Sequence, residues 1–310
     1  MQCYFELKQQ VNNTAVALGF FDGLHRGHLS VIEPAAQQSK NGLTSVCLTF
    51  GKSPKAVISG MDMPMLMTHG DKIKALEKLG IDKTFFIDFQ SVKELGAQEF
   101  FDRVICETLS AKKLYCGFNY RFGKNASGDV ELLEKLCKEK GIELFVAPPF
   151  KIGSEVVCSS LIKQKIADGR VSEANLMLGS LFGFSAPVLH GKRLGRELGT
   201  PTINQAVQKG LILPKFGVYA SVVTLESGER FCGVTNVGIK PTVGGEKPLY
   251  ETWMPKYRGG EIYGQTADIR LLDFIRAEKR FDSLNDLKRE IFLNSKVALS
   301  IYENHEKHNA

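Results

Sequence analysis

Short apolar runs and amphipathic helical patterns alternate along the first half of the chain, and this alternation restricts the fold more than any other feature. The apolar runs are rich in Val, Phe and Ile, as buried strands are. They begin at Thr14, Thr44, Lys83, Ala111 and Ile142. Helical patterns, with apolar residues three or four positions apart, begin at Asp71, Ala97 and Asp129. The alternation predicts an α/β Rossmann-like domain, in which helices cover both faces of a parallel sheet.

One stretch departs from this scheme. The segment from His28 to Lys40 should form the first helix of the domain, yet Pro34 lies in its interior. An interior proline costs a helix about 3 kcal/mol or kinks it. The sequence alone offers no feature that compensates for Pro34.

The pattern changes after about Gly183, where β-type runs separated by Gly and Pro turns take over. These runs begin at Gly217, Arg230, Leu249 and Glu261. They predict a small antiparallel β-barrel or a sandwich, and a helical segment from Ser283 to about Asn304 follows it. Another helical segment, from Ser159, is expected to complete the first domain. We therefore expect two domains, 1–182 and 183–310.

Composition excludes several classes of protein. The 310 residues suit two domains, and no apolar run approaches the ~20 residues of a membrane helix. The first residues lack a secretory signal pattern. Seven scattered cysteines without a CxxC pair indicate neither a disulfide framework nor a zinc site, so we expect reduced thiols in a cytoplasmic protein.

The net charge of +6 is dispersed, with +2 through Ser180 and +4 after it. No segment is a basic block or tail. This mild excess of positive charge suits small anionic substrates better than nucleic acid. The sequence does not indicate an oligomeric state.

The strongest local signal in the first half is GFFDGLHRGHLSVI, which begins at Gly19. A strand is expected to end at Phe21 and a helix to begin around Gly27, which places His25 and His28 at the helix N-terminus. Free backbone N–H groups and the helix dipole favour a phosphate there. Gly27 removes a side chain that would block its approach. Two unrelated surface histidines beside a turn are the alternative interpretation.

This motif resembles the HxGH turn of the nucleotidyltransferase superfamily, in the form that bacterial FAD synthetases carry. Two further segments are similar to that family. GFNYRFGKNASGD, from Gly117, resembles its flavin-side segment, and CSSLIK, from Cys158, resembles its second phosphate-binding segment. The resemblance implies that the FMN phosphate attacks the α-phosphorus of ATP and that pyrophosphate leaves.

The resemblance also implies roles for individual residues. His25 and His28 would stabilise the developing charge, and Asn119 and Arg121 would bind the flavin. The ATP-binding residues would be Gly19, Phe21, Gly27, Ser160 and Lys163.

Three positions depart from the family's pattern. Lys163 replaces the usual arginine, which keeps the charge but loses the bidentate fork. Ser160 replaces a threonine, and FGKSP, from Phe50, lacks the histidine that commonly precedes its proline. A weakened or inactive adenylyltransferase domain is therefore one alternative.

The second half carries HGKRLGRELGTPTIN, from His190 to Asn204. It lacks the spacing of a Walker P-loop, but its glycines permit a tight loop whose N–H groups face phosphates. Thr202 and Asn204 alternate on an expected strand, so their side chains face one side. Their oxygens are hard ligands suited to magnesium that is shared with ATP phosphates. A basic glycine-rich turn without a ligand is the alternative interpretation.

This pattern resembles the riboflavin kinase signature. FGVYA, GVTNVGIKPT, Glu251 before EIYG, and IRAEKRFDSLNDLKREI follow in that family's order. The resemblance implies that Glu251 is the general base for the riboflavin 5′-hydroxyl, that Thr202 and Asn204 hold Mg²⁺, and that Arg276 lies at the flavin-nucleotide side. The residues implied in ATP binding are Gly191, Lys192, Arg196 and Gly199. Ile203 and Trp253 stand where alanine and histidine are usual.

Both motif sets together identify the chain as resembling the bacterial bifunctional riboflavin kinase/FMN adenylyltransferase family. Riboflavin, FMN and ATP are the implied substrates, and FAD, ADP and pyrophosphate the further products. A riboflavin kinase with an altered transferase domain and a flavin-binding regulatory protein are the alternatives.

Overall fold

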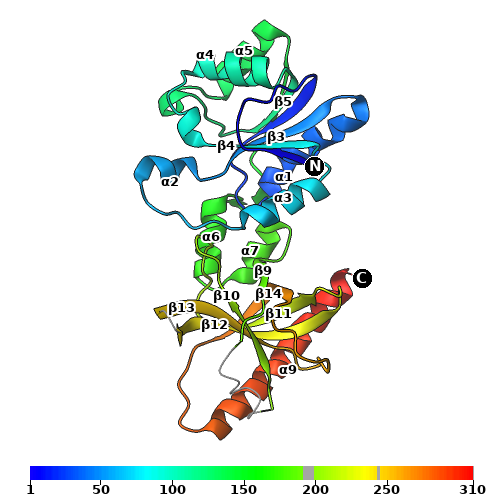
Figure 1. Ribbon diagram of the computed structural model, residues 1–310, viewed down its shortest axis with the longest axis vertical. Helices are drawn as coiled ribbons and strands as arrows, with labels where there is room; N and C mark the ends of the chain where they lie inside the picture. The colour runs from blue at the N-terminus through cyan, green and yellow to red at the C-terminus, as the bar shows by residue number, and fades with distance from the viewer. Residues whose placement is uncertain (191–198, 243–244, 310) are drawn as a thin grey trace. The chain divides into compact units, whose positions relative to one another are not determined.

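The computed structural model describes residues 1–190, 199–242 and 245–309, and their contacts group into two compact units (Figure 1). The first unit comprises Met1–Met65 and His69–Ser159, and the second comprises Leu66–Thr68 and Ser160–Ala310. Among the described residues, no helix is both long enough and apolar enough to cross a membrane.

The first unit is built on a parallel six-stranded sheet with the order β1-β4-β3-β2-β5-β6. Its strands are β1 Gln2–Tyr4, β2 Thr14–Leu18, β3 Thr44–Phe50, β4 Lys83–Ile87, β5 Ala111–Gly117 and β6 Glu143–Ala147. The five expected strands are confirmed, and β1 adds a short strand at the edge. Because β2 pairs with both β3 and β5, the strand order reverses there, and ligands of such sheets bind at the carboxyl ends of the strands at this point.

Helices cover both faces of this sheet (Figure 1), as predicted. They are α1 Arg26–Ala36, α2 Pro54–Ser59, α3 His69–Lys78, α4 Ala97–Phe100, which continues as a π-helix over Phe101–Thr108, and α5 Val130–Lys140. The π-helix and α5 bury their apolar residues against the face that carries Val16 and Leu18. A β7–β8 hairpin, Lys151–Ile152 with Glu155–Val156, follows β6.

Helix α1 runs through Pro34 and ends two residues later at Ala36. The chain then continues as a 3₁₀ segment, Gln37–Asn41, and turns at Gly42 in the left-handed conformation. Proline is tolerated because it lies in the last turn, where its missing N–H interrupts the helix only near its end.

The second unit is an antiparallel six-stranded sheet with the order β10-β13-β12-β11-β14-β9. Its strands are β9 Gly183–Pro187, β10 Thr202–Ala206, β11 Gly217–Leu225, β12 Arg230–Thr242, β13 Gly245–Trp253 and β14 Thr266–Ala277. The strand expected from Glu261 begins only at Thr266, because a turn at Gly264, with φ +79°, precedes it. Helix α9, Leu284–Asn309, packs with Ala298 in an apolar cluster against β11 and β12, which confirms the expected C-terminal helix.

Helices α6, Ser159–Ala167, and α7, Val171–Leu178, group with the second unit, although the sequence placed them in the first domain. The Asn175 side chain on α7 donates to the Leu271 carbonyl at 2.9 Å and accepts from the Phe182 N–H at 2.7 Å. The first bond ties α7 to β14, and the second ties it to the residue before β9. The expected domain boundary between residues 182 and 183 stays a prediction.

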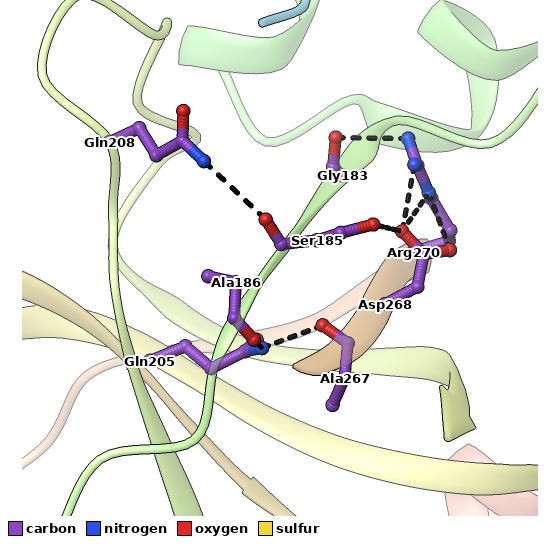
Figure 2. A network of polar contacts seen from close by, with 8 residues as sticks. All are labelled: Gly183, Ser185, Ala186, Gln205, Gln208, Ala267, Asp268 and Arg270. Atoms are coloured by element: carbon purple, nitrogen blue, oxygen red, sulfur yellow. Dashed lines mark hydrogen bonds and ion pairs between the residues drawn. The ribbon is translucent and has the colours of Figure 1, made fainter. Parts of the chain in front are cut away.

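The edge strands β9 and β10 contact each other, which nearly closes the sheet into a barrel. Figure 2 shows the polar contacts beside these strands. The buried Gln205 amide on β10 donates to the carbonyls of Ala186 on β9 and Ala267 on β14, at 2.5 and 2.7 Å. The Leu189 N–H donates to the Asn204 carbonyl at 2.7 Å. Of the two architectures that the sequence left open, the barrel is confirmed.

Replacing Gln205 with leucine removes both of the side-chain bonds that link β10 to β9 and β14. We expect the free energy of unfolding to fall by about 2 kcal/mol, since two buried hydrogen bonds are lost. Urea unfolding followed by the fluorescence of Trp253, the single tryptophan of the chain, measures this change. The control is Gln208→Leu, because Gln208 is exposed and makes one long bond to the Ser185 carbonyl at 3.4 Å. Equal unfolding midpoints for the two variants would contradict the role given to Gln205.

Candidate active sites

The motif from Gly19 and the segment from Gly117 lie on neighbouring strands of the first unit. Gly19 follows β2, Gly117 ends β5, and the two strands pair in parallel up to Leu18 and Cys116. Both segments therefore begin at the carboxyl edge of the sheet, where the strand order reverses. Sheets of this topology bind their ligands there.

The β2–α1 turn holds two buried residues in a strained backbone conformation. Phe21 and Leu24 have φ values of +52° and +45°, which non-glycine residues rarely adopt. A Cβ atom at Gly19 would lie 2.7 Å from the Phe21 ring. Gly19 thus gives the folded-back Phe21 ring its space, and the ATP contacts predicted for both residues stay predictions.

His25 is the N-cap of α1. Its Nδ1 accepts a hydrogen bond from the His28 N–H at 3.2 Å, and the two imidazole rings stack with centroids 3.5 Å apart. Burial lowers the pKa of His25 to about 4. The ring is therefore neutral near pH 7, and with Nδ1 accepting, its proton lies on Nε2.

His28 is neutral for the same reason. Burial is the main cause that lowers its pKa well below the ordinary value, and the nearby His25 and Lys72 add to the effect. Its Nδ1 is buried without a hydrogen-bond partner among the described residues, and its ring meets the edge of the Phe21 ring at 5.3 Å. The pair can donate hydrogen bonds to an anion without carrying a positive charge.

Gly27 lies between the two histidines and leaves little free space. A Cβ atom there would be 3.3 Å from the His25 ring and 3.5 Å from the Val157 carbonyl oxygen. A side chain would crowd the turn at the point where the helix N-terminus is open. The close approach of a phosphate, for which glycine was predicted there, stays a prediction.

The segment from Cys158, which is predicted to bind phosphate, begins beside this turn. The Ser159 hydroxyl donates to the Asp22 carbonyl at 3.0 Å, within the first unit. Ser160 and Lys163 follow on α6 and belong by contacts to the second unit. Their predicted role in holding the triphosphate stays a prediction.

The segment from Gly117, which is predicted to bind the flavin, leaves the end of β5. Asn119 is exposed, and its Oδ1 lies 3.3 Å from the position of a Cβ at Gly117. Arg121 forms an ion pair with Asp129 at 3.3 Å, and Asp129 caps α5 by accepting from the Leu132 N–H at 3.0 Å. The guanidinium of Arg121 is thus held near the N-terminus of α5.

The sequence analysis missed Lys72, a buried lysine on α3. Only 2% of its surface is exposed, and its ammonium donates to the Phe20 carbonyl at 2.9 Å. Lys72 precedes the buried Leu76 by four positions, so the two lie on the same face of the helix. A lysine on the apolar face of an amphipathic helix is the sequence signal that could have identified it.

In the second unit, strand register places the key polar residues in one row. Asn204 on β10 is opposite Glu251 on β13, and Glu251 is opposite Asn236 on β12. The row continues through Val218 on β11 to Arg276 on β14. Directly opposed residues share a face of a sheet, so one face presents all five side chains. Asn236, inside the GVTNVG run, is the member that sequence analysis missed.

Thr202 lies on the same face as Asn204, two positions earlier, as predicted. It is opposite Trp253 and lines a cavity of about 720 Å³. Gly199 and the aromatic residues Trp253, Tyr257, Tyr263 and Phe292 also line this cavity. Its size suits a small-molecule ligand, and Thr202 belongs to its wall.

The remaining predicted phosphate-binding residues of this unit, Gly191, Lys192 and Arg196, lie outside the described residues. No cluster of three or more His, Cys, Asp or Glu side chains that could hold a metal ion occurs in the part of the chain that the structure describes.

Arg276 is anchored to helix α9. Its Nε lies 3.0 Å from the Glu290 carboxylate and 3.4 Å from the Asn294 amide oxygen, and its guanidinium lies over the Phe281 ring at 5.6 Å. A hydrogen bond from Lys279, with the charges of Lys279 and Arg276, lowers the pKa of Glu290. These contacts hold Arg276 at the end of the polar row.

Comparison with known proteins gives a match for each half of the chain. The FAD synthetase family model matches residues 7–161, and the riboflavin kinase family model matches residues 178–302. The chain is 32% identical to the bifunctional riboflavin kinase/FMN adenylyltransferase of Listeria monocytogenes, over 89% of this chain and 88% of the relative. It is 30% identical to the protein of that name from Bacillus subtilis, over 97% and 96% of the two chains.

One solved structure matches both units. A crystal structure described as a macrolide-efflux protein from Streptococcus pneumoniae has a TM-score of 0.86 and 28% identity, over 96% of this chain and 97% of its own. The match shows that the two chains share a fold.

The neutral state of His25 predicts how stability depends on pH. Its pKa is about 4 in the fold against an ordinary 6.5, so the unfolded chain binds the proton first as the pH falls. The free energy of unfolding therefore decreases by up to about 3 kcal/mol as the pH falls from 6.5 to 4. Asparagine also caps helices but does not titrate. When the pH is lowered from 7 to 4.5, we expect the free energy of unfolding of His25→Asn to fall by about 2 kcal/mol less than that of the unmodified chain.

Urea unfolding at the two pH values, followed by circular dichroism, measures this difference. The control is His308→Asn, on the exposed end of α9, which should behave as the unmodified chain does. An equal loss of stability in His25→Asn would contradict the prediction.

Proposed function

The chain belongs to the bifunctional riboflavin kinase/FMN adenylyltransferase family, and on this basis we propose which residues carry its two reactions. It phosphorylates riboflavin with ATP to give FMN, and it transfers AMP from ATP to FMN to give FAD and pyrophosphate. We assign the adenylyl transfer to residues 1–182 and the kinase reaction to residues 183–310. The seven free cysteines support a cytoplasmic location.

The observation that carries the kinase assignment is the position of Glu251 directly opposite Asn204. The riboflavin 5′-hydroxyl is a neutral alcohol, so it must lose a proton as its oxygen bonds to the γ-phosphorus. Glu251 accepts this proton while the bond between the γ-phosphorus and the bridging oxygen breaks and ADP leaves. Asn236, on the other side of Glu251, orients the carboxylate.

Thr202 and Asn204 hold a magnesium ion together with the phosphates of ATP. The pairing of a hydroxyl and an amide oxygen on one face of β10 supports this role, because Mg²⁺ prefers oxygen ligands and keeps part of its shell for phosphates and water. The ion supplies neutralisation of phosphate charge. Gly191, Lys192, Arg196 and Gly199 are the proposed phosphate-binding loop, and Arg276 binds at the flavin side.

In the adenylyl transfer, an FMN phosphate oxygen bonds to the α-phosphorus of ATP, and pyrophosphate leaves. His25 and His28 donate hydrogen bonds to the charge that develops on the phosphate oxygens. Their neutral state at a helix N-terminus supports this role, because preorganised donors there stabilise anions without a proton transfer. Gly27 admits the phosphate, Ser160 and Lys163 hold the triphosphate, and Asn119 and Arg121 bind FMN.

Glu251→Gln should separate the two activities. Loss of the base lowers kcat for FMN formation from riboflavin by about 10²- to 10⁴-fold, since glutamine keeps the shape but accepts no proton. FAD formation from added FMN should be unchanged, which serves as the control within the same protein. Chromatography of the products with Mg-ATP measures both rates. Unimpaired FMN formation would exclude Glu251 as the base, and absence of FAD from the unmodified chain would exclude the transferase function.

Asn204→Ala should raise the Mg²⁺ concentration that gives half-maximal FMN formation by at least about 10-fold. Loss of a group that only hydrogen-bonds to a metal ligand already lowers metal affinity by that factor. Titration of Mg²⁺ after treatment with EDTA measures this shift. The Mg²⁺ dependence of FAD formation from added FMN is the internal reference and should not move. An unchanged Mg²⁺ requirement for FMN formation would remove Asn204 from the metal site.

A further inference from the structure

Lys72 is a buried cation that the reaction described above does not use. It lies on α3, and its ammonium donates to the Phe20 carbonyl at 2.9 Å. The hydroxyl of Thr49, on β3, donates to the same carbonyl oxygen at 2.8 Å. The ammonium also lies 4.8 Å from the centre of the Phe20 ring. One carbonyl thus receives hydrogen bonds from two different elements.

This carbonyl belongs to the peptide that precedes the strained residue Phe21. A non-glycine residue with a positive φ costs of order 1–3 kcal/mol and persists only where its surroundings hold it. The Phe21 ring in turn meets the edge of the His28 ring at 5.3 Å. A continuous set of contacts therefore runs from Lys72, through the Phe20–Phe21 peptide, to the imidazole at the start of α1.

We propose that Lys72 is a positioning residue for adenylyl transfer, whose ammonium holds the strained Phe20–Phe21 peptide so that Phe21 fixes the orientation of the His28 ring. The proposal rests on the transferase function given above. It assigns no contact with ATP or FMN to Lys72.

The cost of burying a lysine supports a role beyond packing. Burial of an ammonium is unfavourable even when it is hydrogen-bonded, and an apolar side chain of similar size often gives a more stable fold. The charge has a second effect, because Lys72 and His25 are the two groups that add to burial in lowering the pKa of His28. The same ammonium thus favours both the orientation and the neutral state of the imidazole.

Lys72→Met is the direct test, because methionine keeps the unbranched chain and removes the charge and the donor. We expect kcat for FAD formation from FMN to fall by about 30- to 100-fold, because a small displacement of a catalytic group such as the His28 ring can reduce the rate by this much. The KM values for FMN and ATP should stay within about three-fold. Riboflavin phosphorylation, assayed on the same sample, should not change. The matched control is Lys74→Met, two positions away on the exposed side of α3, which should leave both activities unchanged.

Thr49→Val provides the second test, since valine keeps the shape and removes the other donor to the Phe20 carbonyl. We expect a smaller fall in kcat for FAD formation, about 5- to 10-fold. Because both donors act on one oxygen, the double variant should lose less than the product of the two single losses. Thermal unfolding followed by circular dichroism checks that each variant keeps its fold.

The possible results separate the two claims. An unmodified chain that forms no FAD would overturn both the transferase function and this inference. A folded Lys72→Met protein whose kcat for FAD formation stays within three-fold, or which raises only KM, would overturn the positioning role alone. If Lys72→Met does not fold, Thr49→Val decides, and an unchanged kcat in that variant would overturn the role.

Discussion

Strand register is the constraint on which the kinase site depends. Asn204, Glu251 and Asn236 share one face only because β10, β13 and β12 pair without a slip. A shift of β10 by one residue would turn Asn204 away from Glu251 and bring the apolar Ile203 into its place. Closure of the barrel protects this register, since Gln205 bonds the edge strand β10 to both β9 and β14.

The first unit secures its site differently, through a short strained turn rather than through a long register. Burial keeps His25 and His28 uncharged, so the proposed phosphate site consists of neutral imidazoles beside a helix N-terminus. The buried cation of this unit is Lys72, whose ammonium donates to the Phe20 carbonyl.

The spacing of apolar residues was sufficient to predict most elements. A strand or helix with one buried face must repeat its apolar residues at the period of that element. Helices α3, α5 and α9 follow this rule, whereas β2, β3 and β4 are buried on both faces and were identified as short apolar runs. Periodicity did not show to which unit α6 and α7 belong, because an apolar helical face can pack against either unit. Contacts such as those of Asn175 decide this. Pro34 was compatible with α1 only because the helix ends two residues later, which no local pattern shows.

The sequence by itself determined that the first unit is α/β and the second an antiparallel β fold, the order of the two motif sets, and the residue types available for phosphate, metal and proton transfer, since these depend on local patterns. Only the tertiary structure decided that Asn236 lies next to Glu251, that Gly19 makes room for Phe21, and that Lys72 reaches the Phe20 carbonyl. The two residues of each pair are brought together by a backbone turn or by the pairing of two strands. Such contacts depend on the register and the strained conformation of the folded chain, and side-chain periodicity carries no information about either.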